Sequence, residues 1–260
     1  MPEFVCINSR DNEKIKEVVR ISSSPKHRKT SGLFVLEGLR LCIDAYRNGY
    51  KIEKVFITDE VSKNPLVIEL ASSVNSCFKI SADLFNKISD TKSPQGILCV
   101  CRIPTQQPQF NLKGRYIALE NIQDPSNLGA IARTAEAFGL SGIIISDSGC
   151  DPFSPKVMRA SMGALLRIPV FNFSDFADSL QKLSDEGMSI YATVVDGFDA
   201  CVSDVDFCPG TVVIMGNEAN GVSDVVRGIA KQKITLPMTG RAESLNVAAA
   251  AAIFIWEMTR

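Results

Sequence analysis

Two short apolar runs near the carboxyl end of the chain, each leading directly into a polar loop, constrain the fold most. Residues 211–215 (Thr-Val-Val-Ile-Met) precede Gly-Asn-Glu-Ala-Asn-Gly at 216–221, and residues 234–236 precede a second loop that ends at Asn246. Short runs rich in β-branched residues are typical of buried parallel strands. Because ligands of open α/β sheets bind at the carboxyl ends of the strands, the two loops predict one shared pocket.

The residues that follow the second loop predict a buried helix with more apolar surface than one sheet face covers. Residues 247–255 are almost wholly apolar, and Ser244 and Asn246 are both candidates to cap the start of the helix. Residues 253–256 (Ile-Phe-Ile-Trp) are consecutive large apolar side chains. Since one neighbouring sheet face covers only part of such a helix, we expect the remainder to be buried in a homodimer.

A strand–helix–strand pattern lies upstream of these loops. Residues 115–119 and 142–146 are predicted strands, and the residues between them predict a helix over 127–138. Asn127 stands at the predicted start of this helix and is a candidate N-cap, whereas Arg133 falls away from the apolar side. The remaining helices and strands predicted in this half of the chain are at 157–165, 168–171, 174–186 and 189–195.

The first hundred residues predict a smaller α/β domain, because short strands alternate with short helices. An amphipathic basic helix around Ile15 and a turn-rich basic loop over residues 22–32 come first. The strands that apolar runs predict are at 33–37, 54–58, 77–80 and 97–101, and the helices are at 38–48, at 64–71 and after Ser81.

The boundary between the two halves is marked by a loss of periodicity. Residues 104–113 contain two prolines and several glutamines, which is typical of a semi-stiff linker. A chain of 260 residues is also longer than one typical domain. We therefore expect a domain over residues 1–104, a linker over 105–113 and a second domain over 114–260.

The charge of the chain is unevenly distributed. The formal net charge of −1 argues against a strongly basic nucleic-acid binder. Basic residues nevertheless concentrate near the amino terminus, and this segment is a candidate contact for phosphates. The alternative is an ordinary solvated helix face, because Glu13 and Glu17 are interleaved with the basic residues. The basic residues of this segment are Arg10, Lys14, Lys16, Arg20, Lys26, Arg28 and Lys29.

Cysteine usage and hydropathy favour a reducing compartment. The eight cysteines are scattered, and His27 is the one histidine available to join them in a metal site. The sequence shows neither a signal-peptide pattern nor an apolar run long enough to span a membrane. We expect a cytoplasmic protein with reduced thiols, no metal and no membrane contact.

Several common catalytic motifs are excluded. The spacing of Gly216 and Gly221 invites comparison with a P-loop, but Val222 stands where that motif requires lysine. No Gly-x-Gly-x-x-Gly follows a predicted strand, which disfavours the usual dinucleotide fold. The chain also lacks the Gly-x-Ser-x-Gly turn of serine hydrolases.

The motifs at 216–221, at 236–238 (Leu-Pro-Met) and at 244–247 (Ser-Leu-Asn-Val) resemble those of SpoU-type RNA 2′-O-ribose methyltransferases. The stretch from Arg115 to Ser146, which includes Asn127 and Arg133, is similar to the first motif of the same family. This resemblance implies a parallel-sheet domain of the SPOUT superfamily with a trefoil knot, which binds S-adenosylmethionine.

The amino-terminal half resembles the substrate-binding domain of many such enzymes. Residues 33–38 and 93–96 carry this likeness, and the fold is shared with ribosomal proteins that bind kinked RNA. The resemblance therefore implies structured RNA as the partner.

The resemblance also implies roles for individual residues. Arg133 would clamp an RNA phosphate and ribose, or act as general base; a guanidinium holds its proton tenaciously, which favours the clamp. Glu218 would support the pocket through loop amides or the arginine, and Asn246 would lie beside the reacting hydroxyl. The catalytic residues implied are Asn127, Arg133, Glu218, Ser244 and Asn246. The cofactor-binding residues implied are Thr193, Gly216, Asn217, Gly221, Leu236, Met238 and Leu245.

The predicted function is S-adenosylmethionine-dependent 2′-O-methylation of RNA. Ribosomal RNA is preferred over transfer RNA as the substrate, because an added amino-terminal domain is more typical of members that act on ribosomal RNA. The competing hypothesis is a non-catalytic RNA-binding protein that keeps the fold. One departure from the family pattern is Ala248, which replaces a small polar residue.

Overall fold

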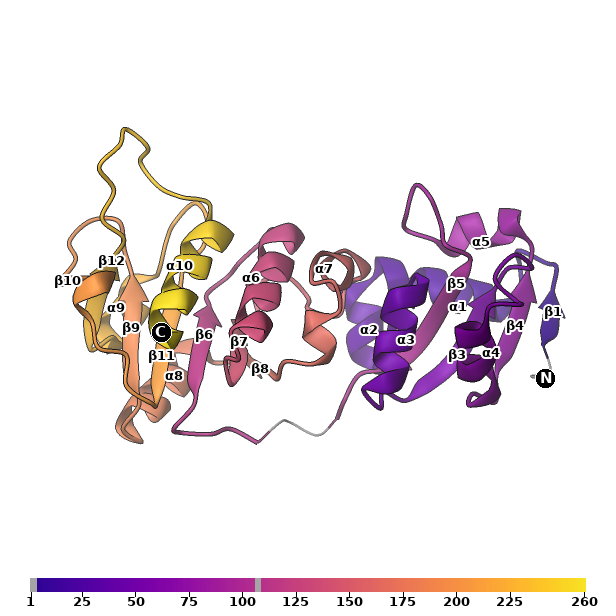
Figure 1. Ribbon diagram of the computed structural model, residues 1–260, viewed down its shortest axis with the longest axis horizontal. Coiled ribbons are helices and arrows are strands. Elements are labelled where there is room, and N and C mark those ends of the chain that lie inside the picture. Colours follow the sequence, from indigo (N-terminus) through magenta and orange to yellow (C-terminus); the bar gives the residue numbers. More distant parts are fainter. Residues whose placement is uncertain (1–3, 106–108) are drawn as a thin grey trace. The chain divides into compact units, whose positions relative to one another are not determined.

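The computed structural model describes residues 4–105 and 109–260, which form two compact units (Figure 1). The first unit comprises Met1–Gln106 with Asp151–Leu166, and the second comprises Gln107–Cys150 with Arg167–Arg260. The segment Asp151–Leu166, which the sequence placed in the second domain, thus groups by its contacts with the first unit. Residues 106–108 of the predicted linker lie outside the described residues.

The first unit is built on a five-stranded mixed sheet with strand order β1-β4-β3-β5-β2. Strands β1, β4 and β3 are parallel, and β5 runs antiparallel to β3 and β2. The elements of this unit are β1 (Val5–Ile7), α1 (Glu13–Ser23), α2 (Pro25–Ser31), β2 (Leu33–Glu37), α3 (Leu39–Arg47), β3 (Ile52–Ile57), α4 (Pro65–Ser72), β4 (Cys77–Ile80), α5 (Ala82–Ile88), β5 (Ile97–Arg102), α7 (Pro155–Ala160) and the 3₁₀ helix η1 (Ala164–Leu166). The four predicted strands are present, and β1 is an additional edge strand.

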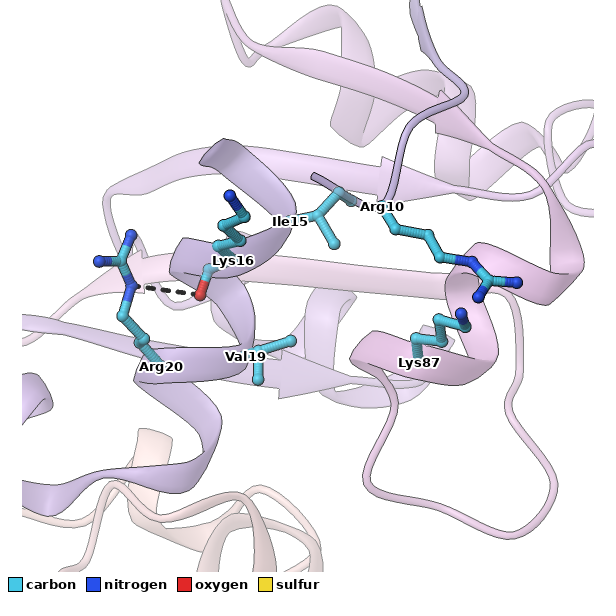
Figure 2. A pocket seen from close by; sticks show the side chains of 6 residues that line it. All are labelled: Arg10, Ile15, Lys16, Val19, Arg20 and Lys87. Atoms are coloured by element: carbon cyan, nitrogen blue, oxygen red, sulfur yellow. Dashed lines mark hydrogen bonds between the residues drawn. The ribbon is translucent and has the colours of Figure 1, made fainter. Parts of the chain in front are cut away.

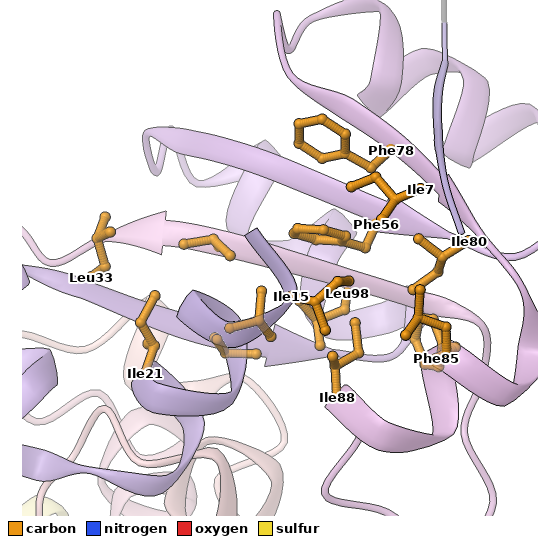
Figure 3. Packing of buried hydrophobic residues seen from close by; sticks show 14 residues of the cluster. Ile7, Ile15, Ile21, Leu33, Phe56, Phe78, Ile80, Phe85, Ile88 and Leu98 are labelled. Atoms are coloured by element: carbon orange, nitrogen blue, oxygen red, sulfur yellow. The ribbon is translucent and has the colours of Figure 1, made fainter. Parts of the chain in front are cut away.

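Side chains alternate between the two faces of this sheet, as the two-residue period of a strand requires. On one face, Val35, Phe56 and Leu98 pack in a single cluster with Ile15 of α1 and Phe85 of α5 (Figure 3). Helices α1 and α5 therefore cover this face, and helices α3 and α4 pack together on the other.

The prediction of a basic loop over residues 22–32 is wrong. Helices α1 and α2 occupy most of this stretch, separated by Ser24, whose side chain caps α2. Arg28 on α2 is 3% exposed; its guanidinium donates to the Asp151 carboxylate at 2.6 Å and to the carbonyl oxygen of Ile21 at 2.6 Å. Arg28 is thus a buried, paired residue and is not available to RNA phosphates.

The second unit is built on a seven-stranded sheet with strand order β10-β12-β9-β11-β6-β7-β8, and its pairings are parallel. This confirms the predicted parallel α/β fold, while the trefoil knot stays a prediction. The elements of this unit are β6 (Arg115–Leu119), α6 (Pro125–Ala137), β7 (Gly142–Ser146), β8 (Val170–Phe173), α8 (Phe176–Asp185), β9 (Ser189–Thr193), β10 (Ala200–Cys201), the 3₁₀ helix η2 (Val202–Asp204), β11 (Thr211–Met215), α9 (Asp224–Ile229), β12 (Gln232–Thr235) and α10 (Val247–Thr259).

Part of the predicted linker belongs to the fold of the second unit. The ring of Phe110 stacks on Tyr116 of β6 with 4.3 Å between the ring centroids. The hydroxyl of Tyr116 donates to the carbonyl oxygen of Asn111 and accepts from its amide. Phe110 and Asn111 of the predicted linker therefore pack against β6 and belong to the second unit.

Within residues 4–105 and 109–260, no helix has the length and apolar character needed to cross a membrane.

Candidate functional site

A cavity of about 640 Å³ lies in the second unit, at the carboxyl ends of β9, β11 and β12. The residues that follow β9, the loop at 216–222 after β11 and the loop between β12 and α10 all line it. The two loops that the sequence analysis singled out therefore enclose one cavity, as parallel strands that end at the same sheet edge require.

The structure brings most of the predicted site residues to this cavity. Glu218, Ser244 and Asn246 line it, whereas Asn127 and Arg133 on α6 do not. The predicted cofactor-binding residues that line it are Thr193, Gly216, Asn217, Gly221, Leu236, Met238 and Leu245.

The loop after β11 closes tightly on itself. The backbone amides and carbonyls of Asn217 and Gly221 are hydrogen-bonded to each other at 3.1 and 2.8 Å, and the Asn217 side chain accepts from the amide of Ala219 at 2.9 Å. A Cβ atom on Gly216 would overlap the backbone of Gly221 and Val222. Gly216 was predicted to allow the backbone to approach a ligand closely; the closure of the loop on itself already requires glycine at this position.

The segment after β6 is hydrogen-bonded to both ends of this loop. The carboxylate of Glu120 accepts from the Ser223 amide at 2.9 Å and from the Ser223 hydroxyl at 2.6 Å. The carbonyl oxygen of Asn121 accepts from the Asn217 side chain at 2.9 Å. Sequence reasoning missed Glu120, although its position directly after a predicted strand, at the same sheet edge as the loops, is the signal that identifies it.

Three predicted catalytic residues from three separate motifs form one hydrogen-bonded chain. The Asn127 side-chain amide donates to Glu218 Oε1 at 2.9 Å, and the Asn246 side-chain amide donates to Asn127 Oδ1 at 3.0 Å. The Oδ1 atom of Asn246 accepts from the backbone amides of Ala248 and Ala249 and caps α10. Asn246 is therefore the cap of α10, and the prediction that Ser244 caps it is wrong.

The interpretation of Asn127 as a helix cap is also wrong. Helix α6 begins at Pro125, two residues before its predicted start, because the Asp124 side chain accepts from the Ser126 amide at 2.7 Å and caps it. Asn127 is the third residue of the helix and is 8% exposed. Its side chain is therefore committed to Glu218 and Asn246.

Glu218 is held by three donors. Besides Asn127, the backbone amides of Gln123 and Asp124 donate to its carboxylate at 3.3 and 3.4 Å. Burial raises the pKa of Glu218, but the hydrogen bonds from Asn127 and the loop amides outweigh it, so the pKa lies below its ordinary value. Glu218 is thus an ionised acceptor at neutral pH, and its partners are loop amides rather than an arginine.

We expect the contacts of Glu218 to break only in acid. Because the folded-state pKa is lowered, the stabilisation is fully present above the unfolded value of about 4.3 and is lost as the pH falls through the lower folded value. Hydrogen-exchange protection of the Gln123 and Asp124 amides, corrected for the intrinsic rate, should therefore stay constant from neutral pH to about pH 5. The Glu218→Gln variant should show low protection of the same amides without an acid step. A loss of wild-type protection already near pH 6 would contradict this assignment.

Arg133 lies on the exposed side of α6 together with Ala130 and Ala137. In the part of the chain that the structure describes, its guanidinium has no hydrogen bond or ion pair. Helix α10 lies beside α6 (Figure 1). An exposed apolar patch, formed by Phe138, Ile253 and Trp256, spans the two helices; these side chains are 41%, 40% and 51% exposed.

The cavity combines apolar and charged walls. Leu236, Met238 and Phe254 supply apolar surface, and Asp196 and Arg227 supply charges of opposite sign. Such walls suit a ligand with a flat apolar ring and a charged tail. S-adenosylmethionine carries an adenine ring and a charged methionine tail, so the residues present fit this cofactor.

Comparison with known families gives a match for each half of the chain. The model of the SpoU rRNA Methylase family matches residues 114–256. The model of the MRM3-like substrate binding domain matches residues 12–99.

Individual relatives are similar over nearly the whole chain. The 23S rRNA (guanosine(2553)-2′-O)-methyltransferase RlmP of Bacillus subtilis is 29% identical, with 97% of this chain and 98% of the relative covered. An uncharacterized tRNA/rRNA methyltransferase of Synechocystis is 31% identical, with 99% and 94% covered. The solved structure of an AdoMet-bound rRNA methyltransferase from Sinorhizobium meliloti is 28% identical, has a TM-score of 0.87 and covers 98% of this chain and 97% of that chain.

Proposed function

Because this chain belongs to the SpoU rRNA methylase family, we propose that it transfers the methyl group of S-adenosylmethionine to a ribose 2′-hydroxyl of ribosomal RNA. The observation that carries the proposal is the hydrogen-bonded chain of Asn127, Glu218 and Asn246, which joins three motifs at the edge of the cavity. A fold kept only for binding would not need to preserve these three side chains in contact.

The cavity residues hold and orient the cofactor, which when bound supplies a methyl group activated by its sulfonium charge. Leu236, Met238 and Leu245 would hold the adenine, and the closed loop at 216–222 lines the same cavity. Asn246, fixed by its two acceptor bonds at the start of α10 and by Asn127, lies where it can orient the ribose hydroxyl. Ser244 is exposed and is a second polar group for the substrate.

Arg133 is the residue we assign to the RNA phosphate. A guanidinium presents planar, bidentate donors to a phosphate and does not readily give up its proton, so positioning is its role rather than base catalysis. Alignment of the hydroxyl oxygen with the methyl carbon supplies much of the rate in such a transfer.

We infer that the protein is a homodimer through the exposed sides of α6 and α10. The patch of Phe138, Ile253 and Trp256 supplies the apolar centre that a stable interface needs. Arg133 lies on the same exposed side of α6 and does not line the cavity of its own chain. Dimerisation would therefore carry Arg133 into the interface, and we infer that the methyl-transfer site is shared between subunits.

Replacing Trp256 by glutamate should convert the dimer into monomers. A buried carboxylate without a partner is costly, and a central tryptophan commonly contributes about 2 kcal/mol or more, so the dissociation constant should rise by about 30-fold or more. The matched control is Val225→Glu on α9, where an apolar side chain is 68% exposed outside the patch. Light scattering at micromolar concentration should give a dimer mass for the wild type and the control. A monomer mass for the wild type would show that the homodimer proposal is wrong.

Ribosomal RNA is the substrate we propose, with transfer RNA as the alternative. The support is that similarity to the RlmP enzyme extends through the amino-terminal domain, with 97% of this chain covered. We propose the cytoplasm as the compartment of this protein, because the similar enzyme RlmP is from a bacterium, where ribosomal RNA is made in the cytoplasm. The test is methyl transfer from labelled S-adenosylmethionine to unmodified ribosomal RNA and to transfer RNA, followed by nuclease digestion to identify a 2′-O-methylated nucleoside. Transfer only to transfer RNA, or no transfer, would overturn the proposal.

We also propose that much of the RNA affinity resides in the amino-terminal unit. Deleting residues 1–104 is a poor test, because Asp151–Leu166 packs within that unit. The ring of Phe153, for example, lies 5.0 Å from that of Phe34. Deletion would expose this apolar surface, so substitutions of single charges are the sharper experiment.

A further inference from the structure

A shallow groove of about 430 Å³ lies on the amino-terminal unit, where α1 faces α5 (Figure 2). It is far removed in sequence from the cavity that we assign to methyl transfer. The residues that line it are Arg10, Ile15, Lys16, Val19, Arg20 and Lys87. Four of these six side chains are cationic and none is acidic, so the walls of the groove favour an anionic ligand.

The shape of the groove is fixed by the core beneath it. Ile15 of α1 and Ile88 of α5 are both buried in the cluster that covers one face of the sheet (Figure 3). Lys16 and Arg20 lie about one helical turn apart on α1, and Lys87 lies across from them on α5. Packed helices hold Lys16, Arg20 and Lys87, and Arg10 lies in the turn that precedes α1. Three of the four cations are therefore presented on a rigid surface.

Arg10 and Lys87 form one end of the groove without a counter-charge. Figure 2 shows the Arg10 side chain extending toward Lys87. Neither side chain has an ion pair or hydrogen bond to any residue that the structure describes. Two like charges on one wall repel each other, so an anion bound between them would lower the free energy.

Lys16 and Arg20 form the other end and share one counter-charge. Both are paired with Glu13, at 3.1 and 3.4 Å, and Glu13 is 76% exposed. Hydrogen bonding and charge from Lys16, followed by the charge of Arg20, lower the pKa of Glu13. Exposed ion pairs of this kind are weak, so a stronger anion can displace Glu13. Glu13 therefore competes with any ligand for these two cations.

We propose that this groove binds the sugar–phosphate backbone of RNA, with Arg10 and Lys87 as the anchor and Glu13 as an internal competitor that limits the affinity. The inference rests on the proposed function, because it takes RNA as the substrate. The walls offer cations and the half-exposed Val19 but no acceptor or aromatic ring, so they suit phosphate and ribose rather than base edges. The groove thus adds affinity without sequence preference.

The test measures binding of a fluorescently labelled oligouridylate to the full-length protein over a series of salt concentrations. The Arg10→Ala/Lys87→Ala variant should bind on the order of 10-fold more weakly at 0.1 M salt, and the slope of log K against log salt should flatten by about 1.4, since two phosphate contacts are lost. The matched control is Arg47→Ala/Lys63→Ala, which removes the same charge from exposed positions on α3 and before α4. The control should keep the wild-type slope.

Glu13→Gln supplies a test in the opposite direction. It releases Lys16 and Arg20, so RNA should bind several-fold more tightly and with a steeper salt slope. If the Arg10→Ala/Lys87→Ala variant matches its control, or if Glu13→Gln leaves affinity unchanged, the groove does not bind RNA. Equally tight binding of labelled oligoglutamate would assign the groove to an acidic peptide and overturn the proposal.

These outcomes are separable from failure of the proposed function. If the wild type methylates ribosomal RNA while all three variants bind RNA alike, the groove proposal alone is wrong. If the wild type transfers no methyl group to any RNA, the function itself is wrong. Thermal unfolding of each variant should remain at the wild-type temperature, because the substituted side chains are on the surface.

Discussion

Replacing Arg133 by alanine should leave the affinity for S-adenosylmethionine near the wild-type value and lower the rate of methyl transfer to RNA by about 100-fold or more. Arg133 is exposed and does not line the cavity, and within residues 4–105 and 109–260 its guanidinium makes no hydrogen bond or ion pair. Its loss should therefore spare cofactor binding, which calorimetry measures directly. It should remove the group that holds the RNA phosphate and ribose in line.

Two further variants sharpen this prediction. Arg133→Lys keeps the charge but loses the bidentate fork, so it should recover only part of the rate if the role is to clamp a phosphate. Lys182→Ala on α8 removes an exposed helical cation elsewhere in the unit and should transfer methyl groups at the wild-type rate. If Arg133→Ala reaches the wild-type rate with saturating RNA, Arg133 has no role in the reaction.

Gly216→Ala should weaken S-adenosylmethionine binding by about 100-fold, and Gly216→Val should abolish it. The added Cβ atom would overlap the backbone of Gly221 and Val222, so the loop that lines the cavity would have to open. Overpacking of this kind costs about 3 kcal/mol, which corresponds to a factor of about 100 in the dissociation constant. The effect arises within the loop itself, before any ligand is considered.

Gly228→Ala on α9 is the matched control for this prediction. A Cβ atom at Gly228 would meet no atom within 4 Å, and alanine favours a helix. Calorimetry should therefore give the control wild-type affinity, and circular dichroism should confirm that Gly216→Ala keeps its secondary structure. Wild-type affinity in Gly216→Ala would show that the loop tolerates the side chain and would contradict the geometry.

The strands of the second unit were predictable because they are buried on both faces. Residues 142–146 and 211–215 are rich in β-branched residues, and residues 116–119 are an apolar run (Tyr-Ile-Ala-Leu); each matches a strand of the sheet. Both loops of the cavity follow such strands directly, so their shared position followed from the direction of parallel strands. The family resemblance then supplied the cofactor and the reaction, which no periodicity could supply.

The features that could not be predicted from the sequence are contacts between residues far apart in the chain. Arg28 was counted among exposed cations, yet its carboxylate partner is Asp151, which is 123 residues away. Asp124 and Asn127 are both residue types that cap helices, and the structure assigns the cap to Asp124, which is followed by Pro125 at the first helical position. Nothing local indicates that the side chain of Asn127 instead contacts Glu218, 91 residues later.

The pairing of Glu120 with Ser223 was missed for the same reason. Both residues follow strands of one sheet, but β6 and β11 are neighbours in space and 103 residues separate the two side chains in sequence. The sequence places Glu120 at the carboxyl edge of the sheet, but strand order depends on how the whole domain packs, so the sequence does not specify Ser223 as its partner.

Mapping ribose 2′-O-methylation in total RNA, from cells with and without the gene, tests the central claim most directly. Deletion should remove a 2′-O-methyl group from ribosomal RNA, and re-expression of the wild type should restore it. Re-expression of Arg133→Ala should leave the site unmodified, although the variant protein still binds S-adenosylmethionine. An unchanged ribosomal RNA pattern on deletion, with a methyl group lost from transfer RNA or from no RNA at all, would contradict the account.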